Sequence, residues 1–334
     1  MNPTQQVITV TRFGGPEVLT PATAPVPAAG PGEVVIDVAA ADVLSLDALI
    51  RSGRAAEFFP VQPPYVPGGG VAGTVAAAGD GVDRAWVGRR VIARTGGPGG
   101  AGGYAERAVA AIDRVIAVPD GVGLRDAAAV LHDGVTAQLL AERTGIRHGD
   151  QVLILGAAGG LALLLGQLAR AAGARVIAAA RGQAKLDFLA ERGADATVDY
   201  SEPDWTKRVL EVTGGAGPAV VFDGVGGELG TAAFGITAAG GRFSAHGAPS
   251  GGFAAIDPQD AERRRITVRG IEQAQPSDGE HARGAERVLA EVAAGRVRPH
   301  VGQVFPLADA AAAHAAIEAR TAIGKTLLTV TVSL

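Results

Sequence analysis

The chain of 334 residues contains no cysteine, and aromatic residues make up only 4% of it. The absence of cysteine excludes disulfide bonds and thiolate-bound zinc, and it is typical of a cytoplasmic protein. The net charge is −4, and there is no block of lysine or arginine of the kind that binds nucleic acid or membrane surfaces. No stretch is long and apolar enough to span a bilayer, and the N-terminus lacks the pattern of a secretory signal. We therefore expect a cytoplasmic protein that binds neither nucleic acid nor membranes.

The first third of the chain is expected to be an all-β, barrel-like module. Short segments of alternating polar and apolar residues are separated there by turn residues. A short helix is expected over residues 47–53, and residues 60–70 contain four prolines and three glycines, which indicate irregular backbone. The expected strands cover residues 7–11, 32–40, 71–78, 90–94, 104–109 and 115–118.

From Leu124 the pattern changes to helices that alternate with apolar strands. Residues 124–145 are expected to be helical, and six strands with intervening helices predict a doubly wound parallel sheet. The six strands are expected at residues 152–155, 176–180, 197–199, 220–223, 242–245 and 266–269. A helix near 281–294 and strands near 304 and at 327–332 are expected to rejoin the first module. The domains are therefore expected to be 1–123 with 271–334, and 124–270.

Residues 151–200 have the pattern of a dinucleotide-binding unit. An apolar run over 152–155 predicts a buried strand, and the small residues of 156–160 predict a tight turn before a helix with one apolar stripe. Small residues let the backbone approach a pyrophosphate, and the N–H groups at a helix N-terminus bind it. Alanine replaces the usual glycine at Ala157 and Ala162, so the turn alone does not distinguish this unit from any tight connection. The complete strand–helix–strand pattern favours the nucleotide.

The residues after the second strand of this unit favour NADPH over NADH. An acid usually holds the ribose hydroxyls of NAD at this point, but none follows directly after Ala180. Arg181 and Lys185 instead provide cations where a ribose phosphate is expected, and Tyr200 after the next strand adds a hydroxyl. The alternative for each cation is an ordinary solvated side chain. The missing acid and the two cations together predict NADPH.

Eight short motifs are spread over the whole chain. They are FGGPEVL (13–19), PGEVVIDV (31–38), VPGGGVAGTV (66–75), GGYAE (102–106), GVTA (134–137), GAAGG (156–160), VVFDGVGG (220–227) and AHAAIEARTAIGKTLLTV (313–330). In this order they resemble the zinc-independent quinone oxidoreductases of the medium-chain dehydrogenase/reductase superfamily. The resemblance implies an α/β protein with a GroES-like β-barrel domain and a Rossmann domain. It also implies a homodimer that reduces small-molecule quinones or conjugated enones with NADPH.

The resemblance also implies which residues contact the cofactor. Those that would hold its pyrophosphate are Gly156, Ala157, Ala158, Gly159, Gly160 and Leu161. Those that would surround its ribose phosphate are Arg181, Lys185 and Tyr200. Those that would line the nicotinamide or the adjoining ribose are Thr136, Val225, His246 and Lys325.

Comparison with the zinc alcohol dehydrogenases of the same superfamily argues against a catalytic metal. Those enzymes have a cysteine at the position of Leu44 and a His-Glu pair at the positions of Gly69 and Gly70. Leucine and glycine have no ligand atoms, so a site with three protein ligands cannot form, and we expect no metal. By its spacing to Thr136, His132 falls on the third ligand position. We therefore expect it on the substrate side of the nicotinamide.

Three residues are candidates for a catalytic role. Hydride transfer to an enone or quinone leaves an enolate-like oxygen or a carbanion, and a histidine can protonate it near neutral pH. We predict that His132 is this general acid and that Asp133 tunes it; the alternative is a packed or helix-surface histidine. Asp47 matches a position that is often acidic in the family, and its alternative role is a helix cap or a scaffold hydrogen bond. Tyr65 either stacks on an aromatic substrate or fills the cleft.

The sequence thus predicts a zinc-independent oxidoreductase that transfers hydride from NADPH to a quinone or an α,β-unsaturated carbonyl. Quinone oxidoreductases usually have an asparagine at the position of Leu44, and this change, together with His132, leaves two alternatives open. One is a tailoring enoyl reductase or ketoreductase that acts on a polyketide-like or acyl-thioester substrate. The other is a non-catalytic NADPH-binding sensor.

Overall fold

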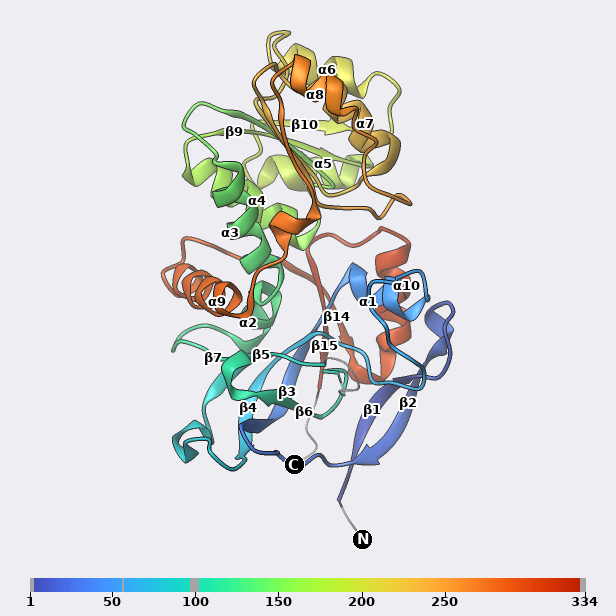
Figure 1. Cartoon of the computed structure of the whole chain (residues 1–334), viewed down its shortest axis with the longest axis vertical. Coiled ribbons are helices and arrows are strands. Elements are labelled where there is room, and N and C mark those ends of the chain that lie inside the picture. Colours follow the sequence, from blue (N-terminus) through green and yellow to red (C-terminus); the bar gives the residue numbers. More distant parts are fainter. Residues whose placement is uncertain (1–2, 56, 97–101, 331–334) are drawn as a thin grey trace. The chain divides into compact units, whose positions relative to one another are not determined.

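The computed structural model describes residues 3–55, 57–96 and 102–330, and the chain divides into two compact units (Figure 1). Unit 1 comprises Met1–Gly134 and Asp278–Leu334, and unit 2 comprises Val135–Ser277. The boundaries expected from the sequence differ from these at both ends. Helix α2 (Leu124–Val130) packs on strands of unit 1, and Gln273 donates a hydrogen bond to Ser244 inside unit 2. No helix of the described residues is long and apolar enough to cross a membrane.

Unit 2 is a doubly wound parallel sheet in the order β10-β9-β8-β11-β12-β13, as the alternating pattern predicted. Its strands are β8 (Gln151–Leu155), β9 (Arg175–Ala180), β10 (Ala196–Asp199), β11 (Val220–Asp223), β12 (Arg242–Ala245) and β13 (Thr267–Arg269). Its helices are α3 (Asp133–Thr144, which begins in unit 1), α4 (Gly160–Ala171), α5 (Gln183–Glu191), α6 (Trp205–Val212), α7 (Gly227–Gly235) and α8 (Pro258–Arg263). The chain order reverses between β8 and β11, which is where Rossmann domains bind their cofactor.

The buried apolar runs explain the strands of unit 2. The side chains of β8 from Val152 to Leu155 and those of β11 are buried, as expected for a parallel sheet covered by helices on both faces. Phe222 of β11 and Phe243 of β12 are among the largest fully buried side chains of the chain. Leu164, Leu165 and Ala169 of α4 are buried, which agrees with the apolar stripe in the sequence.

Unit 1 contains a seven-stranded sheet with the main order β14-β15-β3-β4-β5-β7, in which β6 also pairs with β3, and a separate β1-β2 ribbon (Figure 1). Its strands are β1 (Thr4–Val10), β2 (Leu19–Pro25), β3 (Glu33–Val43), β4 (Gly70–Ala78), β5 (Arg90–Arg94), β6 (Arg107–Ala111), β7 (Val115–Ala117), β14 (Val301–Pro306) and β15 (Lys325–Thr329). Strand β3 is the centre, because it pairs antiparallel with β4, β6 and β15. The end of the last expected strand, residues 331–332, lies outside the described residues.

Three helices besides α2 belong to unit 1. They are α1 (Ser45–Arg51), α9 (Asp278–Ala293) and α10 (Ala310–Glu318). Helices α1 and α10 pack side by side, and α10 also contacts β14 and β15 (Figure 1). Arg51 of α1 is buried and pairs with Glu318 at the end of α10, which adds an ionic contact to this packing.

The structure differs from the expected helix over 124–145, which is broken in two. Leu131 and His132 form a turn between α2 and α3. His132 therefore does not lie on a helix surface. The break lies at His132, the candidate general acid.

A buried chain of polar groups connects α1 to α10. The Tyr104 hydroxyl lies 3.3 Å from Asp47 Oδ2 and 3.0 Å from His314 Nε2. Asp47 Oδ2 also accepts the N–H of Leu44 at 2.9 Å, so this carboxylate caps the first turn of α1. Burial raises the pKa of Asp47 to about 6 and lowers the pKa of His314 to about 3. These contacts give Asp47 the scaffold role that the sequence left as an alternative.

This burial predicts a pH-dependent stability. The folded-state pKa of Asp47 lies above its unfolded value, so the folded protein loses stability as the pH rises from about 4 to 6, and the loss is constant above that. Asp47→Asn removes the charge. The stability of this variant relative to the native chain should therefore increase over the same interval, by at most about 3 kcal/mol. Urea unfolding of both chains at pH 4.5 and pH 7.5 measures the difference. Asp113→Asn, at an exposed position, is the control, and an equal pH effect in both variants would contradict the prediction.

Candidate active site

Unit 2 collects most of the predicted cofactor residues at one edge of its sheet. Gly156, Arg181, Tyr200 and His246 follow β8, β9, β10 and β12, and Val225 lies two residues beyond β11. Because the strands are parallel, their carboxyl ends lie at the same edge, where α/β sheets bind ligands. Thr136 lies in the first turn of α3. Of the predicted cofactor residues, only Lys325 belongs to unit 1.

The turn after β8 exposes backbone groups that suit a phosphate. Gly156 has φ +67°, a conformation that favours glycine, and Gly159 is the N-cap of α4 without a side-chain hydrogen bond. The amides of Gly160 and Leu161 are in the first turn of α4 and so have no intrahelical acceptor. The Ala157 N–H donates to a β9 carbonyl at 3.0 Å, and that of Gly159 donates to Gly156 at 3.1 Å. Ala157 and Gly159 therefore contribute small size to this turn.

The predicted ribose-phosphate site contains the two expected cations and an acid that the sequence analysis missed. Burial and the charge of Arg181 both lower the pKa of Lys185, so the two cations lie close enough to repel each other. Asp199, at the end of β10, accepts the N–H of Gly182 at 2.9 Å and both the N–H and the hydroxyl of Ser201. These hydrogen bonds and the charge of Arg181 outweigh desolvation and lower the pKa of Asp199. The net charge of the two cations and Asp199 is positive.

Asp223 fixes the turn that carries Val225. Its Oδ1 atom accepts the N–H groups of Val225 at 2.9 Å and Gly226 at 2.8 Å. The carboxyl is buried, which raises its pKa. A Cβ atom on Gly230 would lie only 2.1 Å from Asp223 Oδ2, so the first turns of α7 must come very close to this carboxyl. The VVFDGVGG motif therefore shapes the edge of the sheet next to β8.

His246 is held by a short chain of hydrogen bonds. Its Nδ1 atom lies 2.9 Å from the Ser244 hydroxyl, which accepts a hydrogen bond from Gln273 Nε2 at 2.7 Å. Burial lowers the pKa of His246 to about 4, so the ring is neutral at physiological pH. A neutral imidazole here can form hydrogen bonds to a cofactor but adds no charge.

In unit 1, His132 stands in a cluster of charged groups. Its Nδ1 atom lies 2.8 Å from Asp42 Oδ2. Lys325 Nζ lies 3.5 Å from the same Asp42 oxygen and 3.3 Å from Asp133 Oδ1. Burial alone would raise the pKa of Asp42, but His132 and Lys325 hold it below its usual value. Burial alone would likewise lower the pKa of Lys325, but Asp133 and Asp42 raise it.

The positions that correspond to zinc ligands in the alcohol dehydrogenases lie close together in unit 1. A Cβ atom on Gly69 would lie 3.7 to 3.9 Å from atoms of His132 and Leu44, and one on Gly70 would lie 2.8 Å from His132 Cε1. The positions therefore converge, but only His132 among them has a ligand atom. No group of three or more His, Cys, Asp or Glu side chains in the described residues is placed to hold a metal ion.

The remaining catalytic candidates lie beside this cluster. Asp47 belongs to the polar chain under α1, and it is close enough for the charges of Asp42, His132 and Lys325 to affect its pKa. The backbone of Tyr65 forms two hydrogen bonds with Val10, and its half-buried ring packs against the core of unit 1. Burial raises the pKa of Tyr65 to about 12. A catalytic role for either residue stays a prediction.

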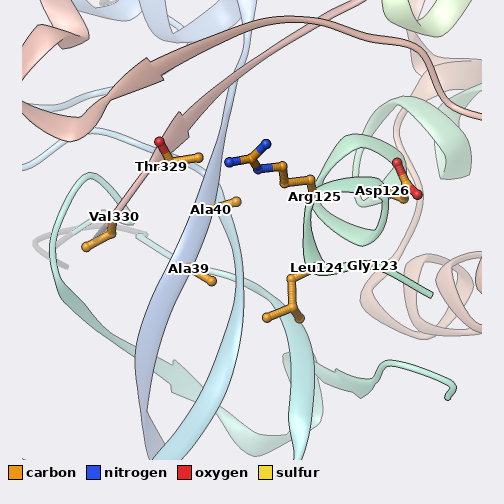
Figure 2. A pocket seen from close by; sticks show the side chains of 8 residues that line it. All are labelled: Ala39, Ala40, Gly123, Leu124, Arg125, Asp126, Thr329 and Val330. Atoms are coloured by element: carbon orange, nitrogen blue, oxygen red, sulfur yellow. The ribbon is translucent and has the colours of Figure 1, made fainter. Parts of the chain in front are cut away.

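A separate pocket lies at the beginning of α2 (Figure 2). It is lined by Ala39, Ala40, Gly123, Leu124, Arg125, Asp126, Thr329 and Val330. None of the predicted site residues is among these. Helix α2 separates the pocket from His132, which follows the C-terminal end of that helix. The candidate proton donor therefore does not line this pocket.

Comparisons with known proteins identify the family. The family model described as "Alcohol dehydrogenase GroES-like domain" matches residues 30–120, and the one described as "Zinc-binding dehydrogenase" matches residues 160–285. A quinone oxidoreductase of Pseudomonas aeruginosa is 33% identical over 95% of this chain and 97% of its own length. A 2-haloacrylate reductase of a Burkholderia species is 32% identical over 94% of this chain and 96% of its own length.

The solved structures agree with these sequence matches. The structure of a mycobacterial protein in complex with NADPH is 34% identical and superposes with a TM-score of 0.86, covering 97% of this chain and 99% of that one. The matched regions include both the sheet of unit 1 and the doubly wound sheet of unit 2. Since the similarity extends over nearly the full length of chain and relatives alike, this chain belongs to the quinone oxidoreductase family of the medium-chain dehydrogenase/reductase superfamily.

Proposed function

We propose that this chain is a metal-independent, NADPH-dependent oxidoreductase that reduces a quinone or an α,β-unsaturated carbonyl compound. The observation that carries the proposal is the edge of unit 2, where a helix N-terminus and the Arg181–Lys185 pair offer sites for the pyrophosphate and the 2′-phosphate of a dinucleotide. The relatives named for quinone oxidation–reduction and for 2-haloacrylate reduction act on conjugated carbonyl compounds. The mycobacterial relative binds NADPH.

The residues of unit 2 fit NADPH. Two cations that repel each other are stabilised when a phosphate binds next to both, and the 2′-phosphate of NADPH provides that charge. The amides of Gly160 and Leu161 suit the pyrophosphate. The oxygens of Asp199 are occupied by Gly182 and Ser201, so this acid is committed to the turn. When bound, NADPH supplies the hydride.

The residues of unit 1 would supply the proton. His132 Nε2 forms no hydrogen bond within the described residues, while Nδ1 is bound by Asp42. Hydride addition leaves negative charge on an enolate or hydroquinone oxygen, and a protonated His132 can donate its Nε2 proton to it. The other ring nitrogen stays fixed on the protein. We therefore assign His132 the role of general acid in this proposal.

Two further features of the proposal are a homodimer and a cytoplasmic location. Strand β13 is an edge strand of unit 2, and all three of its residues are exposed. Val268 in this strand and Ile271 just after it are large apolar side chains with more than a third of their surface exposed. An exposed strand edge with apolar side chains is a suitable surface for pairing with a second copy. The cytoplasmic location is the expectation from the cysteine-free composition.

A substrate panel tests the proposed reaction. The purified chain should oxidise NADPH in the presence of a small quinone or a conjugated enone, and more slowly or not at all with an isolated ketone or an acyl-thioester enone. The loss of absorbance at 340 nm measures turnover. Turnover of the thioester alone would replace the proposal with the enoyl-reductase alternative. Tight NADPH binding without turnover of any substrate would favour the sensor.

The cations of unit 2 should determine the choice of cofactor. Arg181→Ala should weaken NADPH binding about 10- to 100-fold and leave NADH binding nearly unchanged, because only NADPH has the 2′-phosphate. Titration calorimetry with both cofactors measures this. Arg208→Ala is the matched control, since Arg208 is exposed and pairs with Asp204. An equal loss for both cofactors would show that Arg181 does not contact the phosphate.

The proposed acid can be tested by substitution. His132→Asn should lower kcat for an enone about 100-fold or more at neutral pH, because proton transfer then depends on water. NADPH affinity should stay the same. His148→Asn is the matched control, because His148 is exposed and precedes β8, at the other end from the cofactor edge. Full kcat with bound substrate in the His132 variant would rule out the proton-donor role.

A further inference from the structure

Asp42 is a charged residue in an otherwise apolar part of strand β3, residues 38–43. It lies near the end of β3, in the segment AADV, and its side chain has no exposed surface. A buried carboxylate costs several kcal/mol unless charged or hydrogen-bonding partners compensate for the lost water. Its two partners are His132 and Lys325. Both partners contact the same carboxylate oxygen, Oδ2, and Oδ1 has no hydrogen-bond partner in the described residues, so the buried charge depends on both contacts.

The geometry of that contact determines the protonation of the ring. An ionised carboxylate can only accept hydrogen bonds. Because His132 Nδ1 lies 2.8 Å from Asp42 Oδ2, Nδ1 must carry a hydrogen. In the neutral ring the other nitrogen, Nε2, then has a lone pair. In the charged ring both nitrogens carry hydrogens. A proton can therefore enter or leave only at Nε2, which forms no hydrogen bond within the described residues.

The ring is also held sterically. A Cβ atom on Gly70 would lie 2.4 Å from Leu131 Cδ2, 2.8 Å from His132 Cε1 and 3.0 Å from Asp42 Oδ1. Glycine at this position therefore leaves the space that the ring and the carboxylate occupy. A Cβ on Gly69 would only touch the ring, at 3.7 Å. The imidazole is fixed on the Asp42 side, and its side chain is still 22% exposed.

The charged groups that contact one another beside His132 are two carboxylates and one ammonium. Asp42 and Asp133 carry two negative charges and Lys325 carries one positive charge, so an imidazolium makes the set neutral. Within unit 1, the titratable groups around His132 come from five elements. They are Asp42 of β3, Asp47 of α1, Asp133 of α3, His281 of α9 and Lys325 of β15. Burial and the charge of Arg94 lower the pKa of His281 to about 3, so His281 adds no charge.

We propose that Asp42 is the positioning residue of His132, and that the Lys325–Asp133 pair holds Asp42 in place. Asp42 keeps a proton on Nδ1, and its negative charge stabilises the imidazolium, so the Nε2 proton is the one that can be transferred. In the reaction the Nε2–H bond breaks, its electron pair stays on the ring, and a new O–H or C–H bond forms on the reduced substrate. Water then returns the proton. The catalytic part of this inference rests on the proposed function, whereas the geometric part does not.

The first test is the tautomer of His132, which needs no turnover. Two-bond ¹H–¹⁵N spectra of the native chain, with the six histidines assigned by substitution, should show Nδ1 protonated and Nε2 unprotonated in neutral His132. In Asp42→Asn the carboxylate is lost, and the ring should change wholly or partly to the Nε2–H form. Asp37→Asn is the matched control, because Asp37 lies in the same strand but pairs with Arg107 and not with His132. A native ring in the Nε2–H form would overturn the proposal even if the variant fails to fold.

The second test is the pH profile of turnover. In the native chain, kcat for an enone should fall above a certain pH, and in Asp42→Asn this pH should be lower by about one unit or more. Relative to the native chain, the variant should therefore lose at least about tenfold more kcat at pH 8 than at pH 6. NADPH affinity should change little, because all of the predicted cofactor residues except Lys325 are in unit 2. A uniform loss at all pH values would indicate only a structural role for Asp42. If the native chain shows the expected tautomer but reduces no substrate, the proposed function fails and the positioning of His132 stands.

Discussion

A carboxylate without exposed surface lies at the centre of unit 1, and the elements around it are arranged to supply its partners. Asp42 pairs in register with Leu327 of β15, so Lys325, two residues earlier on the same face of that strand, can reach it. The break between α2 and α3 brings His132 to its other side. The pairing of β3 with β15, the end of α2 and the charge balance of Asp42 therefore depend on one another. Loss of any one of these partners would leave a buried charge only partly compensated.

Unit 2 meets a different constraint, which is the common direction of its strands. Parallel strands end at one edge, so the turn after β8, the cations after β9 and the Asp223-bound turn after β11 are collected at the same edge of the sheet. At that edge the first-turn amides of α4 have no intrahelical acceptor, and Arg181 and Lys185 lie close enough to repel each other. Both features suit an anion with several phosphates. The proposed cofactor preference thus follows from the topology together with two side chains.

The sequence predicted the features that depend on local patterns. The strands of unit 2 are buried apolar runs, and all six were found within about two residues of their expected positions. Strand β2 was missed because Pro21 and Pro25 argue against a strand, yet they are tolerated in a two-stranded ribbon that has free edges. The break at Leu131 was missed although His132, Asp133 and Gly134, just after it, have low helix propensity. Helix α2, before the break, packs on β3 and β4.

The parts of the site that depend on distant residues could not be read from the sequence. Asp42 and His132 are 90 positions apart, and no spacing rule connects a strand residue to a residue in a later turn. Asp199 was missed for a related reason, since an acid was sought after β9 and the structure places one after β10, the neighbouring strand. A signal for Asp42 does exist. A lone acid within the apolar end of a central strand requires a buried partner, and a search for that partner would have found a histidine or lysine.

The proposed proton donor, His132 bound to Asp42, also limits which hydride acceptors the site can assist. A metal polarises a carbonyl before hydride arrives, whereas a histidine acts mainly by giving up a proton as negative charge develops. Hydride addition to an isolated ketone places a full charge on one alkoxide oxygen. Addition to a quinone or an enone spreads the charge over a conjugated system, which needs less stabilisation and accepts a proton from a moderate acid. A site that has leucine and glycine at the metal positions and a carboxylate-bound histidine at the third is therefore better matched to conjugated acceptors.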